Sequence, residues 1–274
     1  MIHGCWGGMA EMRVLLWLAI AWSIPGAAAA EPEEVSFPSG GATLRGFVFK
    51  PAGDGPFPAV LYNHGSERLP GSKPEIGALF AGKGYVLFVP HRRGQGRSQA
   101  QGTYIMDALK AAPASSRDAR FVELQEQHQL DVLAALSYLQ GLPYVDRSRT
   151  AVAGCSFGGI QTVLAAEKNV GLRVAVAFAP GAMTWAGSPE LRSRLIAAAR
   201  KATVPVLLIQ AQNDYDLAPT RVLADEMERS GRPHKLAVLP AYGSTNQDGH
   251  GKFCFSGVEA WGPEVLAFLD AAMK

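Results

Sequence analysis

Short apolar runs alternate with longer amphipathic segments along most of the chain. Apolar runs bounded by Gly, Pro or polar clusters predict strands, and apolar positions that recur every three to four residues predict helices. After an initial strand in "EEVSFPS", the predicted strands cover residues 42–50, 59–62, 150–154, 174–178, 204–211 and 235–239, together with the run "YVLFVP". The predicted helices cover residues 74–82, 118–139, 158–167, 191–199, 220–229 and 258–271.

The predicted strands are continuous apolar runs, which is typical of a sheet covered by helices on both faces. Strands that alternate with helices favour a mostly parallel sheet, and the opening pair, joined by a Gly-Gly turn, is expected to form an antiparallel edge. We therefore predict a three-layer α/β fold with a mostly parallel central sheet. We interpret residues 31–274 as one domain, in which insertions at 99–116 and 181–195 are long enough to shape a pocket.

Residues 1–30 have the pattern of a secretory signal peptide. Arg13 precedes an apolar run over 14–24, and a Pro-Gly break and a string of alanines follow, with Ala28 and Ala30 fitting the cleavage rule. The run is shorter than the roughly 20 residues of a comfortable membrane span, although a retained N-terminal anchor is the alternative. The pattern predicts cleavage near Ala30 and a secreted or periplasmic protein without stable membrane insertion.

The charge composition indicates which partners are unexpected, and the cysteine count indicates how the fold is stabilised. The formal net charge is +2 and 18% of residues are charged, without a concentrated run of Lys or Arg, which argues against nucleic acid as a partner. Of the three cysteines, Cys5 lies in the predicted leader, which leaves Cys155 and Cys254 either free or paired. Two cysteines do not make a disulfide framework, so we expect the core to hold the fold together.

The stretch "GCSFG" matches G-x-S-x-G between a predicted strand and a predicted helix. In such an elbow the nucleophile projects from a sharp turn, and the glycines let strand and helix pass closely. Since Gly154 and Gly158 flank Ser156 symmetrically, we predict Ser156 as the nucleophile and expect Cys155 to face the protein interior. A chance match is the alternative, and the strand-turn-helix context argues against it.

A serine nucleophile requires a base, and the base requires an acid that orients it. His250 in "DGHGKFC" follows the last predicted strand, and Gly249 and Gly251 suit a loop with unusual backbone angles. We predict His250 as the base; a solvated loop histidine is the alternative. His128 in a helix and His234 ahead of a strand are expected to be structural or solvated.

Asp214 and Asp216 both follow the strand predicted at 204–211. Asp214 comes first after the strand, so we favour it as the triad acid and expect Asp216 to cap the helix that follows. The spacing alone leaves the choice between them open.

Two backbone N–H groups are candidates for the oxyanion hole. Phe157 opens the helix after Ser156, where its N–H is free to bind an oxyanion. Ser66 follows the early strand in "YNHGS", so we predict its N–H as the second donor, with Gly65 needed for the turn and His64 structural.

The stretch "HRRGQGRS" lacks the lysine of a P-loop and the G-x-G-x-x-G spacing, so we do not predict a nucleotide site there. Arg92 or Arg93 could bind an anionic group of a substrate, but a structural role is favoured for both.

From about residue 35 onward the chain resembles the α/β-hydrolase superfamily, and most of all its dienelactone hydrolase-like branch. The residues that carry the resemblance are "YNHGS", "RRGQGRS", "VDRSRTAVAGCSFGG", "QAQNDYDLAP" and "GHGKFCFSG". The order Ser156, Asp214, His250 is that of α/β-hydrolases. Dienelactone hydrolases proper use a cysteine nucleophile, so the serine here points to a serine esterase of the same architecture.

The resemblance implies acyl transfer from a small-molecule carboxylic ester to water, with neither a metal nor an organic cofactor. A peptidase or amidase with the same triad is the alternative. A non-catalytic binding protein is a further alternative, although such proteins typically lose a triad member. The short insertions favour small or medium acyl groups, while the oligomeric state stays open.

Overall fold

The computed structural model of the chain describes residues 1–4 and 31–274. The predicted signal peptide falls almost wholly on residues 5–30, outside the described residues, and stays a prediction. The strands are β1 (Glu33–Ser39), β2 (Ala42–Phe49), β3 (Phe57–Asn63), β4 (Val86–His91), β5 (Val145–Cys155), β6 (Leu172–Phe178), β7 (Val206–Ala211) and β8 (His234–Leu239). The α-helices are α1 (Pro74–Gly82), α2 (Ile105–Ala111), α3 (Arg117–Gln140), α4 (Phe157–Ala166), α5 (Pro189–Arg200), α6 (Ala218–Arg229), α7 (Phe253–Ser256) and α8 (Val258–Met273).

The strands form one eight-stranded sheet in the order β1-β2-β4-β3-β5-β6-β7-β8. β1 pairs with β2, and β2 with β4, in antiparallel fashion, whereas all other neighbours are parallel. The turn between β1 and β2 places Gly40 and Gly41 at φ values of 54° and 82°, a region that favours glycine. The predicted antiparallel edge and the mostly parallel sheet are therefore confirmed.

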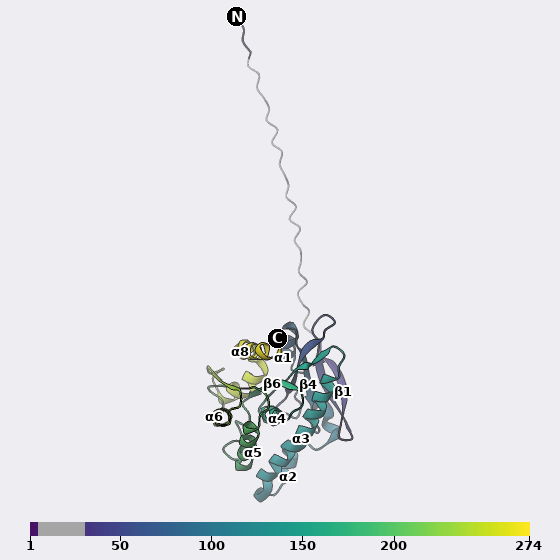
Figure 1. Ribbon diagram of the computed structural model, residues 1–274, viewed down its shortest axis with the longest axis vertical. Helices are drawn as coiled ribbons and strands as arrows, with labels where there is room; N and C mark the ends of the chain where they lie inside the picture. The colour runs from purple at the N-terminus through teal and green to yellow at the C-terminus, as the bar shows by residue number, and fades with distance from the viewer. Residues whose placement is uncertain (5–30) are drawn as a thin grey trace.

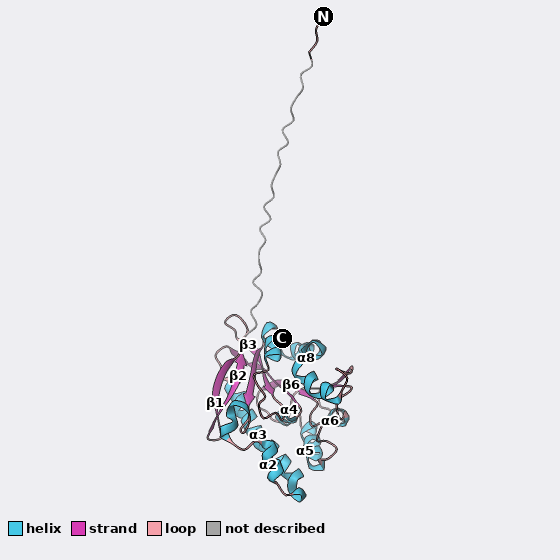
Figure 2. Cartoon of the chain, turned by 180° about the vertical axis from the view of Figure 1, so that it is seen from behind, coloured by secondary structure: helices cyan, strands magenta, loops and turns pink. Residues whose placement is uncertain are grey.

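Helices cover both faces of the sheet (Figure 1). The core on one face includes residues of α1, α7 and α8, and the core on the other includes residues of α2 to α6. Successive residues of one strand contribute to opposite cores: Leu61 of β3 packs on the α3 side, while Val60 and Tyr62 pack on the α8 side. This two-sided burial explains why the central strands are apolar without alternation. The three layers are also visible from behind (Figure 2).

The sequence pattern underestimates β5, which was expected to begin at residue 150. The strand begins at Val145, because Val145 pairs with Phe57 across an irregularity in the register with β3. The polar residues between, "DRSR", hide this half of the strand from a hydrophobicity pattern. Among the described residues, no helix combines the length and apolarity needed to cross a membrane.

Candidate active site

Ser156 lies at the sharp turn between β5 and α4. Its backbone has φ 59° and ψ −115°, a conformation that is costly for a residue with a Cβ atom and that persists where surrounding structure enforces it. The Ser156 N–H donates to the carbonyl of Phe178 at 3.0 Å, which anchors the turn on the neighbouring strand β6. Strained backbone held in this way is common at catalytic elbows.

The glycines of the motif are required by close packing of the backbone. A Cβ atom on Gly154 would lie 2.5 Å from the carbonyl oxygen of Gly158 and 2.7 Å from the Cβ of Asn63. A Cβ atom on Gly158 would lie 2.0 Å from the carbonyl oxygen of Asn63. Neither position accepts a side chain without displacing the elbow or the end of β3.

Asp214 and His250 form a buried pair. His250 Nδ1 lies 2.9 Å from Asp214 Oδ1 and 3.0 Å from Oδ2, and the two side chains are 6% and 0% exposed. Asp216 is placed differently, because its Oδ1 accepts from the N–H of Ala218 at the start of α6. The structure therefore brings Asp214, and not Asp216, to the imidazole.

His250 does not lie on a loop, as the sequence suggested, but inside a short π-helix, Asp248–Lys252, that runs into α7. Neither flanking glycine has a positive φ, so unusual backbone angles do not require them; Gly249 is needed for space against the Asn213 backbone, whereas Gly251 meets only the end of a flexible side chain. A Cβ atom on Gly249 would lie 2.5 Å from Asn213 Oδ1, and one on Gly251 would lie 2.8 Å from Gln247 Nε2. Gly249 thus lets the histidine turn approach the segment that carries Asp214.

A disulfide between Cys155 and Cys254 joins the elbow to the histidine turn. The two Cα atoms are 6.1 Å apart, and both side chains are buried. Cys155 faces the interior at the strand end, and its thiol is engaged in the bond. The pairing left open by the sequence is therefore present, and Ser156 is the available nucleophile of the adjacent pair.

The His250 ring is oriented from two sides. Asp214 holds Nδ1, and the ring of Tyr215 packs edge-on with the ring centroids 5.7 Å apart. Nε2 is buried and makes no hydrogen bond within the described residues. Ser156 Oγ therefore does not donate a hydrogen bond to this nitrogen. Catalytic hydrogen bonds of this kind commonly form at full strength only when substrate binds.

Both candidate oxyanion donors have free N–H groups. Within residues 31–274, neither the Ser66 N–H nor the Phe157 N–H makes a hydrogen bond to backbone or side chain. Phe157 is the first residue of α4, where an N–H has no partner inside the helix. These groups are therefore able to donate to a ligand at the elbow.

His64 lies inside the protein beneath the Ser66 loop. It is fully buried, and its Nδ1 lies 3.0 Å from the carbonyl oxygen of Gly65. Burial, and then the neighbouring Arg92 guanidinium, lower the pKa of His64 well below its usual value, so the ring stays neutral. His64 thus packs as a neutral interior residue. Among residues 1–4 and 31–274, no group of three or more His, Cys, Asp or Glu side chains is placed to hold a metal ion.

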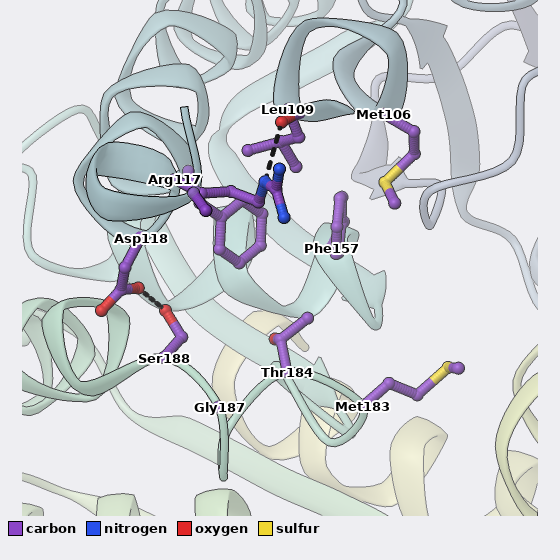
Figure 3. A pocket seen from close by; sticks show the side chains of 11 residues that line it. Met106, Leu109, Arg117, Asp118, Phe157, Met183, Thr184, Gly187 and Ser188 are labelled. Atoms are coloured by element: carbon purple, nitrogen blue, oxygen red, sulfur yellow. Dashed lines mark hydrogen bonds between the residues drawn. The ribbon is translucent and has the colours of Figure 1, made fainter. Parts of the chain in front are cut away.

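An apolar pocket lies beside the elbow (Figure 3). Its volume is about 390 Å³, and both insertions line it: Met106 and Leu109 come from the first, and Met183 and Thr184 from the second. Figure 3 shows the Phe157 ring between these two groups. The sequence indicated the insertions but not these individual residues; in the structure Met106 and Met183 are 42% and 58% exposed.

Comparisons with known proteins agree with this architecture. The dienelactone hydrolase family model matches residues 44–252, which is more than half of the chain. No curated protein gives a significant match.

The solved structures that resemble this chain share its fold. Acylaminoacyl peptidase from Pyrococcus horikoshii, in its uncomplexed form, superposes with a TM-score of 0.67 at 18% identity over 90% of this chain. The match covers only 42% of that peptidase, so this chain spans about two fifths of its length. A protein described as a dienelactone hydrolase from Klebsiella pneumoniae gives a TM-score of 0.65 at 19% identity, covering 89% of this chain and 99% of that one. The α/β hydrolase GrgF from Penicillium sp. sh18 gives 0.64 at 18% identity, with the same coverage.

At these identities the likeness to solved structures concerns the fold, whereas the family match concerns the sequence itself. The chain belongs to the dienelactone hydrolase family and has the α/β-hydrolase fold.

Proposed function

We propose that the protein is a serine hydrolase that cleaves carboxylic esters through an acyl-enzyme on Ser156. The observation that carries the proposal is the buried Asp214–His250 pair, whose free Nε2 belongs to a helical turn that a disulfide fastens to the Ser156 elbow. A base oriented by a carboxylate and brought to a strained serine is the arrangement that activates a hydroxyl group for acyl transfer.

In the proposed reaction, Nε2 of His250 takes the proton of Ser156 Oγ as the oxygen attacks the ester carbonyl. Asp214 keeps the proton of the imidazole on Nδ1 and stabilises the imidazolium that forms. The N–H groups of Phe157 and Ser66 donate to the oxyanion, and His250 returns its proton to the leaving alcohol. Water then attacks the acyl-enzyme with His250 again acting as base, which releases the acid and restores Ser156.

The substrate that we propose carries a small or medium apolar group on one side of the ester. The pocket beside Phe157 has mostly hydrocarbon walls and a volume of about 390 Å³, and burial of an apolar group there would be favourable at about 25 cal/mol per Å². Cleavage of amides with the same triad is the second candidate. It is tested by comparing p-nitrophenyl butyrate with aminoacyl p-nitroanilides.

We further propose that the protein acts in an oxidising compartment, secreted or periplasmic. Two features support this location: the leader pattern at 1–30 and the buried Cys155–Cys254 disulfide, because disulfides persist mainly outside the cytosol.

The replacement Ser156→Ala tests the activity. We expect it to lower kcat for p-nitrophenyl butyrate by at least about 10³-fold without unfolding the protein. Ser193→Ala is the matched control, because it removes an exposed hydroxyl group on α5, outside the proposed machinery, and it should retain kcat within about threefold. Ester hydrolysis at the wild-type rate by the Ser156→Ala protein would refute the proposal.

A further inference from the structure

Arg92, at the end of β4, is a buried cation whose neighbouring carboxylates are engaged with other groups. Its side chain belongs to the largest fully buried ones, at 1% exposure. Glu67 and Asp131 are the acidic groups close enough to raise the pKa of Arg92. Each forms its ion pair with another residue, Glu67 with Lys73 and Asp131 with Arg93. Burying an arginine in this way is expensive, which calls for a reason beyond packing.

The guanidinium of Arg92 binds the backbone of the loop that carries Ser66. Its Nη2 donates to the carbonyl oxygen of Gly65 at 2.7 Å and to that of His64 at 2.9 Å. Burial lowers the pKa of Arg92 to about 10, so the group stays charged at neutral pH and these are charge-assisted hydrogen bonds.

Residues 92–104, which follow β4, donate a hydrogen bond to each backbone carbonyl from His64 to Arg68. Besides the two bonds from Arg92, Tyr104 Oη donates to the carbonyl of Ser66 at 2.6 Å, and Gln95 Nε2 donates to that of Glu67 at 2.8 Å. The N–H of Gly96 donates to the carbonyl of Arg68 at 2.8 Å. The loop that follows β3 is therefore held throughout by residues that follow β4.

The hydrogen bond from Arg92 to the Gly65 carbonyl also fixes the direction of the Ser66 N–H, because both groups belong to one planar peptide unit. In a trans peptide the C=O of one residue and the N–H of the next point in opposite directions. When Arg92 binds the Gly65 carbonyl from the interior, the Ser66 N–H must point away from Arg92. That N–H makes no hydrogen bond within residues 31–274, so it is left free on the side opposite the guanidinium.

We propose that Arg92, assisted by Tyr104, is a positioning residue that fixes the oxyanion hole by holding the backbone of residues 64–66. It does not touch the substrate. Donors fixed before the reaction stabilise the oxyanion without reorganising, and the buried charge of Arg92 adds a favourable field at the same place. This inference rests on the proposed esterase function and deepens it.

Arg92→Gln and Arg92→Lys test the inference, with Arg93→Gln as the matched control. Arg93 is the next residue, but its side chain binds Asp131 and not the loop. For p-nitrophenyl butyrate, we expect Arg92→Gln to lower kcat by roughly 10- to 100-fold with KM within about threefold, since one oxyanion donor is worth more than this. Arg92→Lys keeps the charge, so its kcat should lie between those of Arg92→Gln and the wild-type protein. Arg93→Gln should leave kcat within about threefold.

A trifluoromethyl ketone inhibitor supplies the readout that a merely structural role would not change. Its oxyanion adduct should weaken in Arg92→Gln in proportion to the loss in kcat/KM, while KM for the ester stays nearly constant. Folded Arg92 variants with wild-type kcat and inhibitor affinity would overturn the inference, as would an equal loss in Arg93→Gln.

Tyr104→Phe decides the matter if both Arg92 variants unfold. It removes one hydroxyl group, and we expect kcat to fall about two- to fivefold with a parallel loss of inhibitor affinity. Unchanged kcat and affinity would overturn the inference. Failure of the esterase proposal itself would look different, because wild-type protein would then show no hydrolysis that depends on Ser156.

Discussion

Cys155 and Cys254 are bonded to each other, and each is close in sequence to a member of the candidate triad. Cys155 directly precedes Ser156, and Cys254 lies four residues after His250. The bond closes a separation of 99 residues and ties the end of β5 to the start of α7. Ser156 and His250, the candidate nucleophile and base, are thus both close to one covalent link, which reduces the freedom of the turn that carries His250 relative to the elbow.

Replacing both cysteines by alanine should destabilise the protein and lower its activity. In the chain-entropy model a link across a loop of this length stabilises by about 5 kcal/mol through the unfolded chain, and disulfides typically deliver about 2–4 kcal/mol of this. We expect a corresponding loss in urea unfolding, and a roughly three- to tenfold lower kcat because the base is less well placed. Thiol titration of denatured, unreduced protein starting at residue 31 should detect no free thiol, and two free thiols would contradict this account.

Asp214→Asn and Asp216→Asn form a matched pair that tests the triad acid. Asn at 214 cannot stabilise the imidazolium, so we expect kcat for p-nitrophenyl butyrate to fall by about 10³- to 10⁴-fold. Asn at 216 can still accept the N–H of Ala218 and cap α6, so kcat and stability should change little. A larger loss from Asp216→Asn than from Asp214→Asn would reverse the assignment.

The apolar pocket should determine which acyl groups are accepted. Ala114 lines it, whereas Ala111 lines a neighbouring hollow outside it. Ala114→Trp should reduce kcat/KM for p-nitrophenyl octanoate at least about tenfold more than for the acetate, because the bulk excludes the longer chain. Ala111→Trp should leave the ratio of the two unchanged. Equal chain-length profiles for the two variants would show that the acyl chain binds elsewhere.

His128 on α3 should make the protein less stable at acid pH. Burial, and then the nearby Arg92, lower the pKa of His128 to about 3, although Asp131 opposes this shift. Between about pH 6.5 and pH 3 the unfolded chain therefore binds a proton that the folded chain does not. The free energy of unfolding then falls as pH falls, by at most about 1.4 kcal/mol per pH unit from this residue.

Urea unfolding at pH 7 and pH 5 of wild type and His128→Gln measures this contribution. The variant should show a shallower decrease than wild type, and His234→Gln, at the start of the edge strand β8, serves as control. Identical pH dependence in wild type and His128→Gln would contradict the prediction.

The fold was accessible from sequence because the central strands pack on both faces over most of their length and are apolar there, as Leu61 and its neighbours show, whereas the polar first half of β5 was missed. The G-x-S-x-G motif located the elbow because close backbone contacts between β3, β5 and α4 leave no room for side chains at Gly154 and Gly158. Such short-range requirements leave a signature in the spacing of residues.

Features that depend on distant segments left a weaker signature. The choice of Asp214 over Asp216 depends on how the turn after β7 faces His250, which spacing does not encode. The π-helical turn at His250 was missed because Gly249 is required by contact with Asn213, whereas glycine pairs usually indicate loops. The contacts of Arg92 with the Ser66 loop arise only when β3 and β4 lie side by side.

Labelling with a fluorophosphonate probe tests the central claim most directly, because only a serine activated by a base and served by an oxyanion hole reacts readily. Peptide mapping of the labelled native protein should place one adduct on Ser156, and His250→Gln or prior denaturation should abolish it. An absence of labelling in the folded wild-type protein, or an adduct on another residue, would contradict the account.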